Sequence, residues 1–161
     1  MNEIYIHYGS TSFDPSKFQA IKNEPFWSKP AGGLWAMPKD AKLRWNEWSE
    51  AVGVRERNDE NSFHFTTIPN ANILQINSVE DLYILPKLKN QIELPGIENP
   101  IELPFNWICL DFEKLLADGV DAIQVNISND PHYGVESLRK KLDGWDCDTI
   151  LIMNPDIIVT L

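Results

Sequence analysis

Cysteine is scarce in this 161-residue chain, and long apolar runs are missing from it. The two cysteines, Cys109 and Cys147, are too few for a disulfide framework or a structural zinc site, and their apolar or strand-like neighbours predict buried free thiols. No stretch approaches the roughly 18 uninterrupted apolar residues of a membrane-spanning helix. The N-terminus has no basic region followed by an apolar run, so no secretory signal is expected. These absences favour a cytoplasmic protein with no membrane partner.

Positive charge is also in short supply, with 14 Lys and Arg against 24 Asp and Glu and a net charge of −10. Binding to nucleic acid depends largely on cations that neutralise phosphates, so nucleic acid is not expected as a partner. A pocket for a dinucleotide needs only one or two cations, so the net charge does not exclude a dinucleotide ligand. Tryptophan, by contrast, is abundant, with six copies. Tryptophan concentrates in cores, aromatic pockets and interfaces.

The length and the lack of a linker predict one domain over residues 1–161, and the pattern of short elements predicts an α+β fold with mostly antiparallel strands. The expected strands lie at residues 4–8, 34–37, 63–68, 73–76, 122–127, 149–153 and 157–161. The expected helices lie at residues 16–21, 38–52, 78–85, 111–118 and 135–142.

Prolines mark two further stretches, at residue 38 and at residues 86–104. Pro38 is well placed to begin a helix, on which Trp45 and Trp48 share one side and are expected to pack in the core. Residues 86–104 contain Ile-Glu-Leu-Pro twice, nine residues apart, and are expected to form a surface excursion with extended character.

General catalytic motifs do not appear. The chain has no glycine-rich phosphate loop, no His-Glu-x-x-His pair and no nucleophile elbow. Its three histidines are scattered without metal-ligand spacing, so no metal site is expected.

Three segments together carry a resemblance. They are Tyr-Ile-His-Tyr-Gly-Ser at residues 5–10, Gly-Gly-Leu-Trp-Ala at residues 32–36, and Asp-Cys-Asp-Thr-Ile-Leu-Ile at residues 146–152. In order and spacing the chain resembles the ADP-ribosyltransferase superfamily of the diphtheria-toxin and poly(ADP-ribose) polymerase type. That family has a His-Gly strand end, a glycine-aromatic strand before a helix, and an acid before a late strand. The resemblance implies a central cleft that binds NAD as substrate, without a metal.

The first segment supplies part of the implied NAD site. Gly9 and Ser10 match the family pattern, and a glycine lets the backbone reach the nicotinamide amide. The family histidine directly precedes the glycine, whereas here Tyr8 stands between His7 and Gly9. Either Tyr8 replaces that histidine, or a bulge re-aims His7.

The other two segments supply the remaining groups. Gly33, Leu34 and Trp35 match the second motif, with Trp35 stacking on the nicotinamide ring. Asp148 is the acid implied to act with His7 in catalysis, because a carboxylate stabilises the oxocarbenium ion that forms as nicotinamide leaves. Alternatives for this acid are Asp146 and the weaker candidate Gln124.

The implied function is transfer of ADP-ribose from NAD to an acceptor that the sequence does not identify, with a protein as one candidate, or simple NAD hydrolysis. The alternative is a non-catalytic module whose tryptophans bind another protein. An acidic inhibitor that mimics nucleic acid is a third reading, based on net charge alone.

Overall fold

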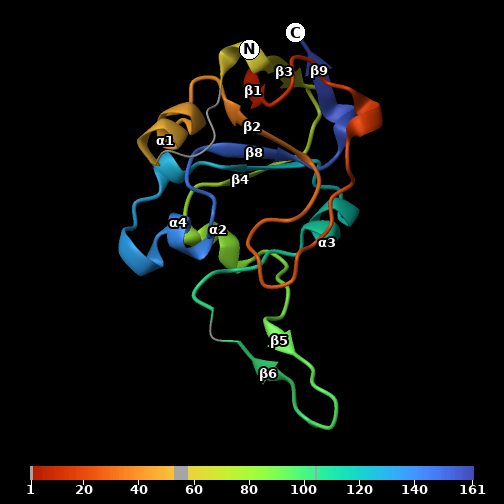
Figure 1. Cartoon of the computed structure of the whole chain (residues 1–161), viewed down its shortest axis with the longest axis vertical. Coiled ribbons are helices and arrows are strands. Elements are labelled where there is room, and N and C mark those ends of the chain that lie inside the picture. The colour runs from red at the N-terminus through yellow and green to blue at the C-terminus, as the bar shows by residue number, and fades with distance from the viewer. Residues whose placement is uncertain (1, 53–57, 104) are drawn as a thin grey trace.

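The computed structural model describes residues 2–52, 58–103 and 105–161, which form one α+β domain (Figure 1). Within these ranges a single mixed sheet holds seven strands: β1 (Tyr5–Tyr8), β2 (Leu34–Pro38), β3 (Ser62–Thr67), β4 (Ile73–Ile76), β7 (Ala122–Val125), β8 (Thr149–Ile152) and β9 (Ile158–Thr160). Their order is β4-β7-β8-β2-β1-β3-β9, and only β4 and β7 are parallel neighbours. The prediction of an α+β domain with mostly antiparallel strands is therefore confirmed.

Short helices cover one face of the sheet. They are α2 (Val79–Tyr83), α3 (Phe112–Ala117) and α4 (Leu138–Lys141), while α1 (Trp45–Val52) lies apart from them (Figure 1). Leu82, Leu115 and Leu138, one from each of these three helices, join Ile123 and Leu151 of the sheet in the largest apolar cluster. None of the helices in the described ranges is long and apolar enough to cross a bilayer.

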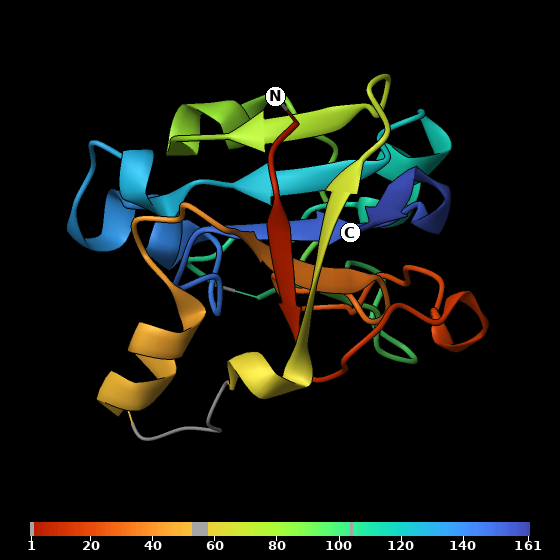
Figure 2. The same ribbon diagram turned by 90° about the horizontal axis from the view of Figure 1, so that it is seen from above.

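The sheet folds over on itself between β2 and β1. Only two residue pairs, Tyr5 with Pro38 and Ile6 with Met37, form the ladder between these strands. Beyond them β1 and β3 cross the strands β4, β7 and β8 (Figure 2). A second apolar cluster, which includes Tyr5, Phe63, Phe65, Ala36, Ala122, Ile150 and Ile152, fills the space between the two halves. Strands β7 and β8 are consequently buried along their whole length.

The helix expected from Pro38 begins seven residues later. Pro38 ends β2, and α1 starts at Trp45. Lys39 continues the β1–β2 pairing by donating its N–H to the Ile4 carbonyl. Farther along, the backbone amides of Lys42 and Leu43 are held by the Asp148 carboxylate. These tertiary contacts override the helix-starting preference of proline.

Residues 86–103 form the expected excursion. The two Ile-Glu-Leu-Pro copies meet at their first isoleucines, Ile92 and Ile101, where β5 (Gln91–Ile92) pairs with β6 (Ile101–Glu102). The two strands form a separate hairpin that projects from the domain (Figure 1). Pro104, at the end of the second copy, lies outside the described residues.

Both cysteines are buried and unbridged, as predicted, and burial raises the pKa of the Cys109 thiol.

Candidate functional site

The three segments that carry the resemblance lie side by side in the structure. Residues 5–8 form β1, residues 34–38 form β2, and residues 149–152 form β8, and these strands are neighbours in the order β8-β2-β1. The first and last are more than a hundred residues apart in sequence. The fold therefore brings the sequence motifs to one place, the line along which the sheet folds over.

His7 lies where β1 and β2 separate. After the pair Ile6–Met37 the backbone ladder stops, and the His7 Nδ1 atom instead lies 2.7 Å from the Trp35 carbonyl oxygen. Since a carbonyl only accepts, Nδ1 carries the proton in this contact. The His7 ring also packs against Phe63, with ring centroids 5.1 Å apart. A side chain thus replaces backbone pairing and holds the strands apart.

A cavity of about 200 Å³ opens at this separation, and we call it the tryptophan cavity. Four of the chain's tryptophans line it, from β2, from α1 and from the loop before β8. The lining residues are His7, Tyr8, Lys29, Trp35, Trp45, Trp48, Gly144, Trp145, Asp146, Cys147 and Thr149.

The tryptophans are fixed by polar as well as apolar contacts. Trp145 is 1% exposed, and its indole N–H donates to the Ser28 carbonyl at 3.0 Å. The Trp45 indole donates to the Thr149 hydroxyl at 2.9 Å, and Trp35 packs against Trp145 with centroids 4.8 Å apart. An indole whose N–H is held keeps its ring orientation, so these walls are preorganised.

Trp45 and Trp48 were expected to pack in the core, but in the structure they also form part of the cavity wall. Trp45 does pack on the small cluster of Ile6, Tyr8 and Met37, but both tryptophans are half-buried and border the cavity. Helical spacing places two residues on one side of a helix without saying whether that side meets a core or a cavity.

The face of Trp35 already attracts a cation. The Lys29 ammonium lies over its indole, 5.3 Å from the ring centroid. The lysine stem also approaches Gly144, where an added Cβ would come within 3.2 Å of the Lys29 Cε atom. This part of the cavity therefore offers a π-face suited to positive charge.

A second hollow of about 550 Å³ adjoins the first, and His7 lines both. Ser10, Gly33 and Leu34 border this second hollow. Gly33 has φ +72°, and a Cβ there would lie 2.6 Å from a methyl carbon of Leu151, so only glycine fits. Gly9 is in neither lining; its φ is +117°, and its N–H donates to the Asn61 carbonyl.

The two acids before β8 lie in different surroundings. Asp148 is 4% exposed and accepts hydrogen bonds from the backbone N–H groups of Lys42, Leu43 and Ser128 and from the Ser128 hydroxyl, at 2.8–3.3 Å. It is not one of the residues that line the tryptophan cavity, whereas Asp146 is. The arrangement thus brings Asp146, rather than Asp148, together with His7 and Trp35.

Gln124 lies on the other side of β8 from these groups. It is 5% exposed, and its Oε1 atom accepts from the Tyr5 hydroxyl at 3.0 Å. Its amide N–H groups reach Glu3 and Asn126. The side chain is therefore engaged between the two halves of the folded sheet.

Tyr8 supplies a hydroxyl that stays protonated. Burial, followed by its hydrogen bond to Asp59 at 3.1 Å, raises the pKa of Tyr8 above its ordinary value of 10.0, although Arg44 acts in the opposite direction. Tyr8 and His7, the two candidates for the family's histidine position, both border the tryptophan cavity.

Sequence reasoning missed Lys29, Trp145, Cys147 and Thr149, which all line the cavity. Trp145 directly precedes the late acidic segment, and a bulky aromatic there is the one signal that pointed to it. Among residues 2–52, 58–103 and 105–161, no group of three or more His, Cys, Asp or Glu side chains is placed to hold a metal ion.

The cavity contains the chemical elements of a site for a flat, positively charged ring: π-faces, a neighbouring carboxylate and hydrogen-bonding groups. Comparison of the chain with known protein families, with curated proteins and with solved structures found no match.

Proposed function

We propose that the chain binds NAD at the fold line of the sheet and transfers its ADP-ribose group to an acceptor or to water. The observation that carries the proposal is the convergence of all three motif segments on one tryptophan-lined cavity. The nicotinamide ring of NAD is flat and positively charged. It would take the place over Trp35 that the Lys29 ammonium now occupies.

The two adjoining hollows suit the two ends of a dinucleotide. The tryptophan cavity is the size of a small ring, and the larger hollow on the other side of His7 has room for the adenosine end. Lys17, and Lys29 once the nicotinamide ring has displaced its ammonium from Trp35, supply cations for the diphosphate. His7, which borders both, is then placed near the ribose hydroxyls.

In this proposal Asp146 provides the negative charge. Cleavage of the nicotinamide–ribose bond leaves positive charge on the ribose, and a nearby carboxylate stabilises that charge more than it stabilises bound NAD. Asp148 takes a different role, because its carboxylate hydrogen bonds tie together residues 42–43 and Ser128. It holds the loop on which Trp45 begins α1.

NAD binding should depend on the cavity tryptophans. Trp48→Ala removes a half-buried wall of the cavity and should weaken NAD binding by about tenfold, the worth of one aromatic contact with its burial. Trp27→Ala is the matched control, because Trp27 is 63% exposed and does not border the cavity. Isothermal titration calorimetry measures both, and equal affinity of the two variants would contradict the proposed site.

Turnover should depend on Asp146. Asp146→Asn keeps the shape of the side chain but removes its charge, so release of nicotinamide from NAD should fall about a hundredfold while NAD affinity stays within a few-fold. Asp143→Asn, three residues earlier and outside the cavity lining, should be as active as the wild type. If the wild type neither binds NAD nor releases nicotinamide with any acceptor offered, the non-catalytic protein-binding module is the better description.

A further inference from the structure

A third hollow, of about 460 Å³, collects positive charge on this acidic molecule. Among the described residues, Lys42, Arg139 and Lys140 line it, against one carboxylate, that of Asp130. The whole chain has ten more acidic than basic residues. The lining of this hollow is therefore positively charged although the chain as a whole is negative. A concave site with excess positive charge suits an anionic ligand.

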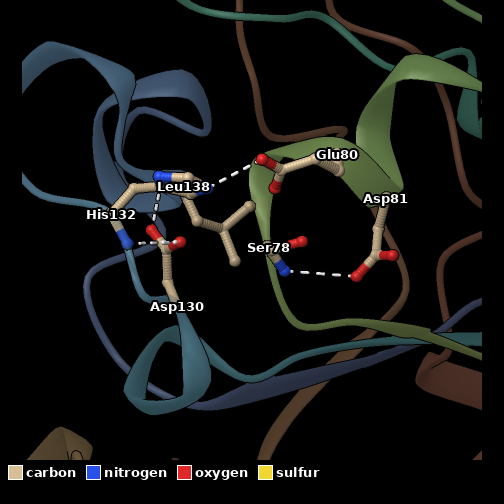
Figure 3. A network of polar contacts seen from close by, with 6 residues as sticks. All are labelled: Ser78, Glu80, Asp81, Asp130, His132 and Leu138. Carbon is tan, nitrogen blue, oxygen red and sulfur yellow. Dashed lines mark hydrogen bonds and ion pairs between the residues drawn. The ribbon is translucent and has the colours of Figure 1, made fainter.

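The single carboxylate is turned toward the protein backbone. Asp130 accepts hydrogen bonds from the backbone N–H groups of His132 and Leu138, at 3.1 Å and 2.5 Å (Figure 3). These two hydrogen bonds orient the carboxylate toward the backbone and order the chain between His132 and Leu138. The same segment is tied to α2, because the His132 Nε2 atom lies 2.8 Å from a Glu80 carboxylate oxygen (Figure 3).

The cations, in contrast, remain available. Within the described residues the ammonium groups of Lys42 and Lys140 make no ion pair, and both side chains are exposed. Arg139 donates one N–H to the Asp146 carbonyl at 3.0 Å, which fixes the guanidinium at the rim and leaves its other donors free for a ligand. Three such groups around a hollow suit a phosphate.

Part of the wall is apolar. Leu43 and the buried Ile127 border the hollow beside the cations, together with the exposed ring of Tyr133. A volume of about 460 Å³ exceeds what a phosphate alone would fill. We propose that this hollow binds a small phosphomonoester, with its phosphate between Lys42, Arg139 and Lys140 and its organic part against Leu43 and Ile127.

This site is separate from the proposed NAD site in its residues, since the two linings share none. They are nevertheless neighbours, because Arg139 contacts the backbone of Asp146 and because Asp148 holds both Lys42 and Ser128. A phosphorylated molecule bound here would lie next to the acid of the tryptophan cavity, which is where an acceptor for ADP-ribose has to approach.

The probe is AMP, with adenosine and inorganic phosphate as its two halves, measured by calorimetry at low ionic strength. The test variant is Lys42→Gln with Lys140→Gln. The control, Lys22→Gln with Lys89→Gln, changes the net charge equally at exposed lysines outside the hollow. We expect the wild type and the control to bind AMP alike, and the test variant to bind it at least about tenfold more weakly. Adenosine and inorganic phosphate should each bind at least about tenfold more weakly than AMP.

Several results would overturn the proposal: no saturable binding of AMP, equal loss in the test and control variants, or adenosine binding as tightly as AMP. If inorganic phosphate binds as tightly as AMP, the contacts of Leu43 and Ile127 with the organic part of the ligand contribute nothing, which contradicts the proposed phosphomonoester site. Loss of AMP binding in Lys17→Gln, but not in the Lys42 and Lys140 variant, would instead place AMP in the second hollow, where the proposed NAD site holds the adenosine end. Because none of these measurements uses NAD turnover, failure here is distinct from failure of the proposed function.

Discussion

At the scale of the residue, the buried Asp148 carboxylate accepts four hydrogen bonds. Its Oδ2 atom accepts from Lys42 N, Leu43 N and the Ser128 hydroxyl, and its Oδ1 atom accepts from Ser128 N. Every one of these partners donates. Only a group with two acceptor oxygens satisfies them all, and this requirement accounts for a buried aspartate at this position.

Asp148→Asn should therefore destabilise the fold. An amide has one NH₂ group, and in either orientation it would face at least one backbone N–H that loses its acceptor. We expect the free energy of unfolding to fall by about 2 kcal/mol or more, measured by urea denaturation. Asp146→Asn is the control, since the Asp146 side chain is not part of this network. Equal stability of the two variants would show that the network contributes little.

The choice between these two acids could not be made from the sequence. Residues two apart share a face of a strand, so the pattern placed Asp146 and Asp148 on one side. The strand, however, starts only at Thr149. Both acids belong to the preceding loop, where alternation does not hold, and one turns to the cavity while the other turns inward. Thr149, the first strand residue, was missed although it borders the cavity.

At the scale of the element, strands with β-branched or aromatic residues were predicted closely. The expected strand at 73–76 coincides with β4, and that at 63–68 differs from β3 by one residue at each end. Ser78 and Asp81 form a capping box before α2, at the start of the helix expected from residue 78. Local signals of this kind act within a few residues. The start of α1 depends instead on contacts to Ile4 and Asp148, which no local pattern contains.

The β5–β6 hairpin should be dispensable for stability. Its apolar residues Leu94, Ile97 and Ile101 are 42–51% exposed, and it pairs with no other strand of the described chain. The Leu103 N–H donates to the Asn90 carbonyl at 2.8 Å, so the two ends of the hairpin already lie close together.

Replacing residues 91–102 by Gly-Gly should leave the midpoint of thermal unfolding within a few degrees of the wild type, because no core contact is lost. Differential scanning calorimetry measures this. Phe112→Ala, which removes a core side chain of α3 that is 1% exposed, is the contrasting variant and should cost about 3–5 kcal/mol. A large loss on deleting the hairpin would show that it supports the domain.

At the scale of the whole molecule, the two halves of the folded sheet meet through a buried polar contact. Tyr5 of β1 is 2% exposed, and its hydroxyl donates to Gln124 of β7 and lies 3.0 Å from a Glu3 oxygen. Burial first, and the Glu3 carboxylate second, raise the pKa of Tyr5 well above its ordinary value of 10.0. Ionisation of this hydroxyl would put a charge between the two layers.

Stability should consequently fall at high pH. The folded state keeps the Tyr5 proton above pH 10, where the unfolded chain releases it, so the stabilisation is complete below that pH and is lost as the pH rises further. The slope contributed by one such group is at most about 1.4 kcal/mol per pH unit. Urea denaturation between pH 9 and 11.5 should give a shallower decline for Tyr5→Phe than for the wild type. Tyr133→Phe, at a residue that is 91% exposed, should decline as the wild type does.

The clustering of four of the six tryptophans around one cavity also gives the molecule a built-in optical reporter. The emission of Trp35, Trp45, Trp48 and Trp145 comes from one place, and the 4.8 Å between the rings of Trp35 and Trp145 is close enough for excitation to pass between them. A ring that enters the cavity would quench several indoles together. Trp27 and Trp107, which do not border the cavity, would remain as a steady background.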